Sequence, residues 1–143
     1  MYGFKPVFIL AALLLGGAGF SVSAQNRFAP DFVLKTSFDA KQNYIVPKDA
    51  RVLIIPHHLV AGREIASLLT SLPAPKYVFL LSPDHFSSGK YFLTAEPAEQ
   101  TEEHGIQGLL PFIQKAWPEA KIAPAMLRID APTSTRLQIT QDI

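Results

Sequence analysis

Two short apolar runs, separated by a stretch with helical periodicity, dominate the hydrophobic pattern in the middle of the chain. Val52–Ile55 and Tyr77–Leu81 are continuous apolar runs, as expected of strands that are buried on both faces of a sheet. Between them, in Ile65–Leu72, apolar residues recur on one face of a helix. This order predicts a right-handed βαβ unit, in which the two strands are parallel and end at the same edge of the sheet.

A second helix is predicted farther along the chain. Apolar residues recur at helical spacing in Ile106–Trp117, with Thr101 as the expected N-cap and two glutamates in the first turn. Pro111 should kink this helix or make it restart, because proline removes a backbone hydrogen bond and collides with the preceding turn.

The segments before the first predicted strand and after the last predicted helix complete the predicted architecture. Lys121–Ile129 resembles a third strand, and Pro124 within it indicates an edge position or a bulge. We therefore predict an α/β fold built from βαβ units around a mainly parallel sheet. Residues 25–50 show no clear period, and we expect them to form an extended lead-in segment with a turn at Pro47–Asp49.

The first 24 residues have the features of a secretory signal peptide. Lys5 precedes an apolar core at Val7–Leu15, and Val22–Ala24 fits the small residues of a signal peptidase site. We expect cleavage after Ala24 and an exported protein, periplasmic or extracellular. The alternative is an uncleaved anchor, which would be the chain's one link to a membrane. The expected organisation is a signal peptide at 1–24, a lead-in segment at 25–50 and an α/β domain at 51–143.

Composition excludes several classes of protein. The chain is 48% hydrophobic and 17% charged, which is typical of a globular domain and not of a disordered chain. It has 13 basic and 12 acidic residues, and the two numbers become equal once the segment with Lys5 is removed. A neutral chain argues against nucleic acid as a partner. The chain has no cysteine, which excludes both a disulfide and a lipid-anchored lipoprotein.

Histidines follow both apolar runs of the predicted βαβ unit. His57 and His58 come after the first strand, and His85 follows the second. Open α/β sheets bind ligands at the carboxyl ends of their strands, so we expect His57 and His85 to meet there and share one divalent metal ion if their strands are neighbours. His58 should point away, because side chains alternate along an extended chain. The alternative is that each histidine is a hydrogen-bonded loop residue.

Three motifs stand in one order along the chain: IIPHHLVAG, LLSPDHF and EEHGIQGLLPFIQ. In this order, from Arg51 to about Arg128, they resemble the Memo-like family, known in prokaryotes as AmmeMemoRadiSam system protein B. That family is similar in fold to the class III extradiol dioxygenases, which hold a non-haem iron in a pocket at the strand ends. The resemblance implies a metal-binding α/β protein that acts as a metal-dependent redox enzyme.

Carried over residue by residue, the resemblance makes His57 and His85 the first two metal ligands. It places Glu103 and His104 on the pocket wall, as candidate catalytic residues that bind a substrate or move a proton. Without the resemblance, the same pair would be interpreted as the solvated first turn of a helix.

Further residues are candidates for a supporting role around the metal. Asp84 and His58 are expected in a second shell, and Asp84 or Glu103 is available as a carboxylate ligand. Two imidazoles with one carboxylate suit iron(II), which is the preferred metal, with zinc or copper as the alternatives.

The sequence departs from the family in two places. The family has a further strand and helix between the second and third motifs, whereas SSGKYFLTAEPAEQ bridges them here. The family's remaining metal ligand comes from a C-terminal half that the chain does not reach before Ile143. We therefore expect a truncated version of the fold, with an incomplete C-terminal half, an uncovered sheet edge and a tendency to self-associate.

Two classes of function are compatible with these observations. The first is an enzyme, redox or hydrolytic, that uses the metal to act on a small molecule of unknown identity. The second is a non-catalytic remnant of the fold that binds a metal or a partner. Family membership does not separate them, because a shared fold does not determine the reaction.

Overall fold

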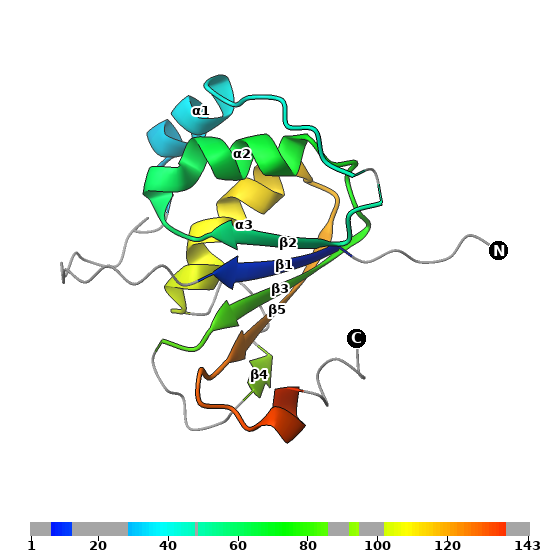
Figure 1. The fold of residues 1–143 in the computed structure, drawn as a ribbon. Coiled ribbons are helices and arrows are strands. Elements are labelled where there is room, and N and C mark those ends of the chain that lie inside the picture. Colours follow the sequence, from blue (N-terminus) through cyan, green and yellow to red (C-terminus); the bar gives the residue numbers. More distant parts are fainter. Residues whose placement is uncertain (1–6, 13–28, 48, 86–91, 95–101, 137–143) are drawn as a thin grey trace.

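The computed structural model describes residues 7–12, 29–47, 49–85, 92–94 and 102–136. They form a five-stranded sheet with helices packed against it (Figure 1). In chain order the elements are β1 (Val7–Ala12), α1 (Asp31–Asp39), β2 (Val52–Pro56), η1 (Leu59–Ala61), α2 (Gly62–Thr70), β3 (Tyr77–Pro83), β4 (Phe92–Thr94), α3 (His104–Ala116) and β5 (Lys121–Leu127). A short helical turn at 133–136 follows the last strand.

Four of the five described strands are parallel. The order across the sheet is β2-β1-β3-β5-β4, and β4 runs antiparallel to its neighbour β5. The arrowheads of β2, β1, β3 and β5 point the same way in Figure 1, so the carboxyl ends of these strands form one edge of the sheet. This confirms the predicted α/β class with a mainly parallel sheet.

The two strands of the predicted βαβ unit are not neighbours, because β1 lies between them. Leu10 of β1 pairs with Ile54 of β2 on one side and with Leu81 of β3 on the other. β1 comes from the apolar run that the sequence identifies as the core of a signal peptide. Such a run is common to signal peptides and buried strands, so periodicity does not distinguish them. The expected cleavage site at Ala24 lies outside the described residues, and cleavage and export stay predictions.

The lead-in segment contains a helix, and the expectation of an extended arm there is wrong. α1 begins after Pro30, with Asp31 in its first turn, where a carboxylate interacts favourably with the helix dipole. Ser37 is the one buried residue of α1, and Val33, Leu34 and Phe38 are partly buried against the core. This apolar face is short, which makes the helix hard to recognise in the sequence. The predicted turn before β2 is confirmed, because the N–H of Ala50 donates to the carbonyl of Pro47 at 3.0 Å.

α3 begins at His104 and has Glu103 as its N-cap. The predicted cap, Thr101, lies outside the described residues. The helix continues through Pro111 to Ala116, so the expected restart at the proline is wrong.

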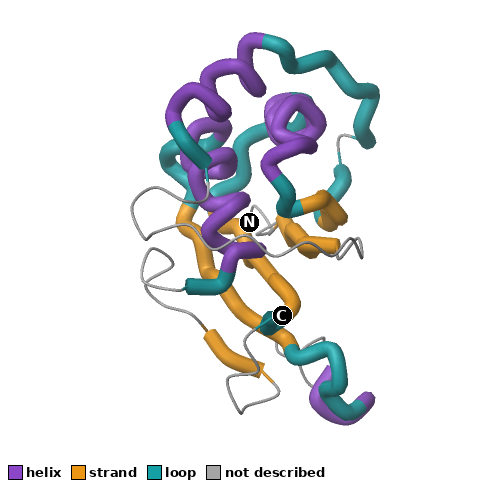
Figure 2. Tube along the Cα trace, turned by 90° about the vertical axis from the view of Figure 1, so that its left-hand side faces the viewer, coloured by secondary structure: helices purple, strands orange, loops and turns teal. Residues whose placement is uncertain are grey.

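α2 and α3 pack together over one face of the sheet, on the upper side in Figure 2. Alternate side chains of β2 and β3 are buried in this core, among them Ile55 and Leu80, while Val52 and Ile54 on the other face of β2 are exposed. Burial on both faces, which the continuous apolar run predicted, is therefore wrong for β2.

β5 accommodates its proline at a position where the sheet is narrow. Pro124 lies opposite Leu80 of β3, and β4 pairs only with Ala125–Leu127. On its outer side Pro124 thus has no strand neighbour within the described chain, which agrees with the predicted edge position.

Candidate functional site

His57 and His85 lie together at the carboxyl edge of the sheet. His57 directly follows β2, and His85 comes two residues after β3. Their ring centroids are 5.4 Å apart, although β1 separates the two strands. The predicted proximity of the two histidines is therefore confirmed, while the predicted adjacency of their strands is wrong.

His104 brings a third imidazole to the same place. It is the first residue of α3, and its ring centroid lies 5.3 Å from that of His57 and 4.0 Å from that of His85. One donor atom from each of the three histidines lies within 4.8 Å of the others. Ligand nitrogens around a tetrahedral zinc, each about 2.0 Å from the metal, are roughly 3.3 Å apart. Small rotations of the three rings would therefore bring them to one ion.

His57 and His85 have buried ring nitrogens that lack ordinary partners. Nδ1 and Nε2 of His57 and Nε2 of His85 have no hydrogen-bond partner within the described chain. His57 is only 4% exposed, so water does not compensate freely. Buried polar atoms are normally paired, and an unpaired set that converges on one point fits a metal ion.

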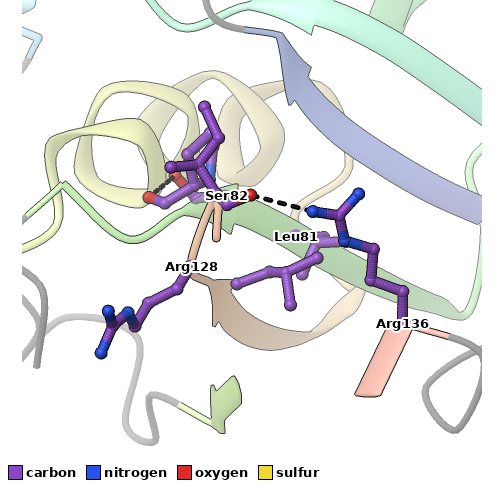
Figure 3. Close-up of a pocket in the computed structure, with 7 residues that line it drawn as sticks. Leu81, Ser82, Arg128 and Arg136 are labelled. Atoms are coloured by element: carbon purple, nitrogen blue, oxygen red, sulfur yellow. Dashed lines mark hydrogen bonds between the residues drawn. The ribbon is translucent and has the colours of Figure 1, made fainter. Parts of the chain in front are cut away.

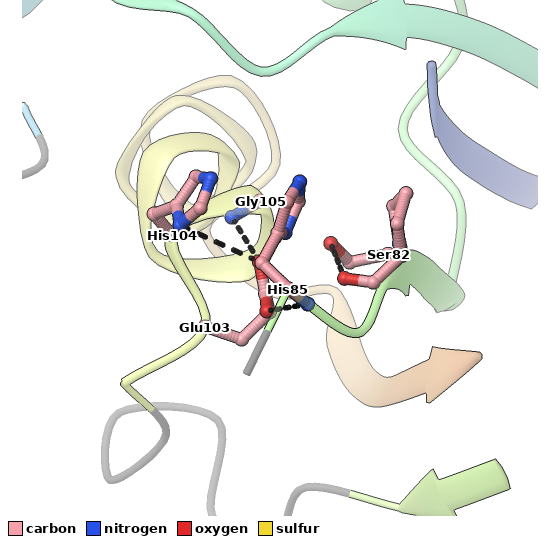
Figure 4. A network of polar contacts seen from close by, with 6 residues as sticks. Ser82, His85, Glu103, His104 and Gly105 are labelled. Atoms are coloured by element: carbon pink, nitrogen blue, oxygen red, sulfur yellow. Dashed lines mark hydrogen bonds and ion pairs between the residues drawn. The ribbon is translucent and has the colours of Figure 1, made fainter. Parts of the chain in front are cut away.

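Glu103 connects two of the three histidines, and its side chain is fully buried. Its Oε1 contacts Nδ1 of His85 at 2.5 Å and accepts the N–H of Gly105 at 3.0 Å, while Oε2 accepts the backbone N–H of His85 at 3.0 Å. Oε1 also lies 3.8 Å from Nδ1 of His104. Figure 4 shows the carboxylate of Glu103 pointing from the start of α3 toward His85.

Burial favours the neutral, metal-binding form of His57 and His104. The pKa of His57 is lowered to about 4, mainly by burial and further by the charges of His58, His104 and His85, while Glu103 opposes the shift. The pKa of His104 is also lowered, first by burial and then by His85. At neutral pH both side chains are therefore neutral, as a metal ligand must be.

The two expected supporting residues lie close to the cluster. His58 is exposed, in contrast to His57, and its ring centroid is 4.3 Å from that of His57. Asp84 is buried, and its backbone N–H donates to the carbonyl of Leu127 at 2.9 Å, which ties the turn before His85 to β5. The supporting roles of both side chains stay predictions.

Two glycines of α3 allow the helix to approach the site, and neither was predicted from the sequence to have this role. A Cβ on Gly105 would come within 2.0 Å of Oγ of Ser82, and a Cβ on Gly108 within 2.7 Å of the carbonyl oxygen of His57. The available signal was the pair of glycines inside an otherwise good helical pattern, because such glycines cost stability unless packing requires them.

A separate hollow of about 240 Å³ lies at the ends of β3 and β5. Its lining residues are Leu81, Ser82, Pro83, Leu127, Arg128, Ile129 and Arg136. In Figure 3 the side chain of Arg136 reaches across from the turn at 133–136, and its guanidinium donates to the carbonyls of Ile129 and Ala131, each at 2.9 Å. The other four lining residues, besides Ser82, Arg128 and Arg136, are apolar.

Comparisons with protein-family models, curated proteins and solved structures gave no match for this chain. Membership of the Memo-like family therefore stays a proposal that rests on the three motifs and their order. Among the described residues, no helix has the length and apolar character needed to span a membrane.

Proposed function

We propose that this protein binds one divalent transition-metal ion through His57, His85 and His104, on a Memo-like α/β scaffold. The observation that carries the proposal is the set of buried nitrogens on His57 and His85 without a hydrogen-bond partner in the described chain. His104 joins them because a donor atom of its ring lies within 4.8 Å of donor atoms of the other two. An unsatisfied buried polar atom costs about 1–3 kcal/mol, and coordination of a metal would offset that cost. The motif order and the position of the histidines at the carboxyl ends of parallel strands support the scaffold.

The proposed ligand set favours zinc or copper over the iron(II) that the sequence suggested. Iron sites with two histidines need a carboxylate with an oxygen directed at the metal. The donor cluster in the described chain consists of imidazoles, and both oxygens of Glu103 accept N–H groups of His85 and Gly105. Three imidazoles suit zinc or copper without a further protein ligand, and zinc is the first metal to test.

The ligand set also ranks the catalytic candidates. Three protein ligands leave a fourth tetrahedral position for water, which is the arrangement of catalytic zinc sites. The bound metal would supply Lewis acidity toward that water or toward a substrate oxygen. Hydrolysis of a small molecule is therefore the second proposal, ahead of the extradiol-type redox reaction, which needs the carboxylate. The non-catalytic alternative uses the same three ligands, and assays of the metal-loaded protein against ester and phosphoester panels distinguish it.

Calorimetric titration of the metal-free protein with zinc at pH 7 tests the metal site. We expect one zinc ion per chain. His57→Ala, His85→Ala and His104→Ala should each weaken zinc binding at least tenfold, because each removes one of three ligands. Even the loss of a residue that only supports a ligand costs about 10–100-fold in affinity. Gln114→Ala, at an exposed position of α3 away from the cluster, is the control and should bind as the wild type does. Wild-type affinity in all three ligand variants would contradict the site. Wild-type affinity in His104→Ala alone would show that His104 is not a ligand and would leave it as a residue of the pocket wall.

A further inference from the structure

The buried carboxylate of Glu103 joins the two chain segments that carry His85 and His104. One segment is the turn after β3, and the other is the start of α3. Glu103 contacts the first segment twice, at the ring Nδ1 and the backbone N–H of His85, and it caps the second by accepting the N–H of Gly105. A single fully buried side chain therefore determines how these two segments sit relative to each other.

These contacts determine which nitrogen of His85 is available. A carboxylate only accepts hydrogen bonds, so Nδ1 of His85, at 2.5 Å from Oε1, is the nitrogen that carries the hydrogen. In a neutral imidazole the other nitrogen, Nε2, then has a free lone pair. That Nε2 is the buried atom of His85 without a hydrogen-bond partner in the described chain.

The close approach of α3 to β3 makes the position of Glu103 hard to change. The backbone of Gly105 lies against Ser82, with no space for a Cβ. Because the helix start cannot shift toward β3 or rotate freely there, the carboxylate is held in reach of His85. His104, the next residue in the chain, is held by the same cap.

We propose that Glu103 is the positioning residue of the histidine cluster. It holds His85 in the Nδ1–H tautomer, with Nε2 facing His57 and His104, and it is not itself a metal ligand. The effect on metal affinity rests on the proposed metal site, whereas the tautomer and the ring position do not. This role differs from the substrate-binding or proton-transfer role that the sequence resemblance implies for Glu103.

Glu103→Gln is the informative substitution, because glutamine keeps the size but replaces one acceptor oxygen by an NH₂ group. If that group faces Nδ1 of His85, it donates to it and moves the ring hydrogen to Nε2, where it blocks metal binding. If the NH₂ group faces the backbone N–H of His85, two hydrogen-bond donors face each other, and the bond that Glu103 accepts from this N–H is lost. Either orientation disturbs His85 without removing volume from the core.

The experiment combines tautomer assignment with zinc titration. Long-range ¹H–¹⁵N NMR of the metal-free protein, labelled at histidine, should show Nδ1–H for His85 in the wild type and a changed tautomer in Glu103→Gln. Zinc affinity of Glu103→Gln should fall about 10–100-fold, as for other residues that orient a metal-bound histidine. Glu103→Asp keeps the charge and should retain more affinity than Glu103→Gln. Glu102→Gln, at the exposed neighbouring carboxylate, is the matched control and should change neither readout.

The outcomes separate the two proposals. Nε2–H for His85 in the wild type overturns the positioning role, and so does wild-type zinc affinity in Glu103→Gln. A wild type that binds no zinc contradicts the metal site, and the tautomer alone then decides on Glu103. If Glu103→Gln does not fold, the wild-type tautomer and the Glu103→Asp variant decide.

Discussion

Gly108 of α3 lies directly against the backbone of His57, so that a Cβ at Gly108 would come within 2.7 Å of the His57 carbonyl oxygen. The obstacle would be backbone and not a flexible side chain, so it could move only together with His57 itself. α3 also carries His104 at its first position. The absence of a side chain at Gly108 is therefore a condition for bringing His104 to His57.

Gly108→Ala should destabilise the protein and weaken zinc binding together. Helix propensity alone would make alanine more stable than glycine by about 1 kcal/mol, whereas forcing a methyl group into a packed contact costs about 1–3 kcal/mol. We expect the steric cost to win, since the closest atom is a carbonyl oxygen of the site. Urea denaturation of the metal-free protein measures whether Gly108→Ala lowers or raises the free energy of unfolding. Gln114→Ala, at an exposed position of the same helix, is the control. Increased stability of Gly108→Ala would contradict the close approach.

The proximity of His57 and His85 could be predicted because parallel strands end at one edge of a sheet, whatever their exact order. The order itself could not be predicted, since the run that forms β1 has the same apolar character as a signal peptide core. α1 was not predicted because the helix is short and its apolar face consists of Val33, Leu34 and Phe38 alone. The resemblance placed His104 on the pocket wall, and without the resemblance the first turn of a helix would be interpreted as solvated. Its inclusion in the histidine cluster depends on close packing that no local pattern encodes.

Acid should destabilise the metal-free protein through His57. Its pKa is about 4 in the folded protein, against 6.5 as the ordinary value, so between these values the unfolded chain binds a proton that the folded chain does not. The free energy of unfolding should therefore fall as the pH drops from about 6.5 toward 4 and should not change through His57 above 6.5. The lowered pKa of His104 acts in the same direction.

Urea midpoints between pH 8 and 4, for the wild type and His57→Asn, measure this effect. Carboxylates also titrate in acid, so the difference between the two proteins, and not the wild-type curve alone, isolates His57. We expect the difference to shrink as the pH falls, because the wild type loses stability that His57→Asn does not have. A difference that grows on acidification would mean that the folded protein favours the charged imidazole.

β1 should be necessary for the stability of the unprocessed chain. Leu10 pairs on both sides, so Leu10→Pro removes an N–H from the middle of the sheet. The acceptor left without a partner costs about 1–3 kcal/mol, and thermal denaturation of the full chain should show a lower midpoint. Leu10→Ile keeps the N–H and is the control. Equal stability of Leu10→Pro and Leu10→Ile would show that the segment contributes no strand in solution.

N-terminal sequencing of exported protein decides how far that result applies. A start at Gln25 would confirm the predicted cleavage and would mean that the mature protein lacks β1. We would then expect the chain from 25 to 143 to melt at a lower temperature than the full chain, because β2 and β3 lose the strand that joins them. A start at Met1 would contradict the cleavage and would leave β1 in the mature sheet.

The uncovered face of β2 should cause self-association. Val52 and Ile54 are 58% and 62% exposed on a strand that, within the described chain, pairs on one side only, with β1. Parallel sheets are normally covered on both faces, and an unprotected apolar edge favours contact with another copy.

Sedimentation velocity over a hundredfold concentration range tests this self-association. The wild type should show a concentration-dependent shift in sedimentation coefficient, and Ile54→Lys a smaller one, because its charge opposes burial between copies. Ile129→Lys changes a residue that is 77% exposed outside the strands, so it is the matched control and should behave as the wild type does. A wild type that stays monomeric throughout, or an equal effect of the two lysine variants, would contradict association through β2.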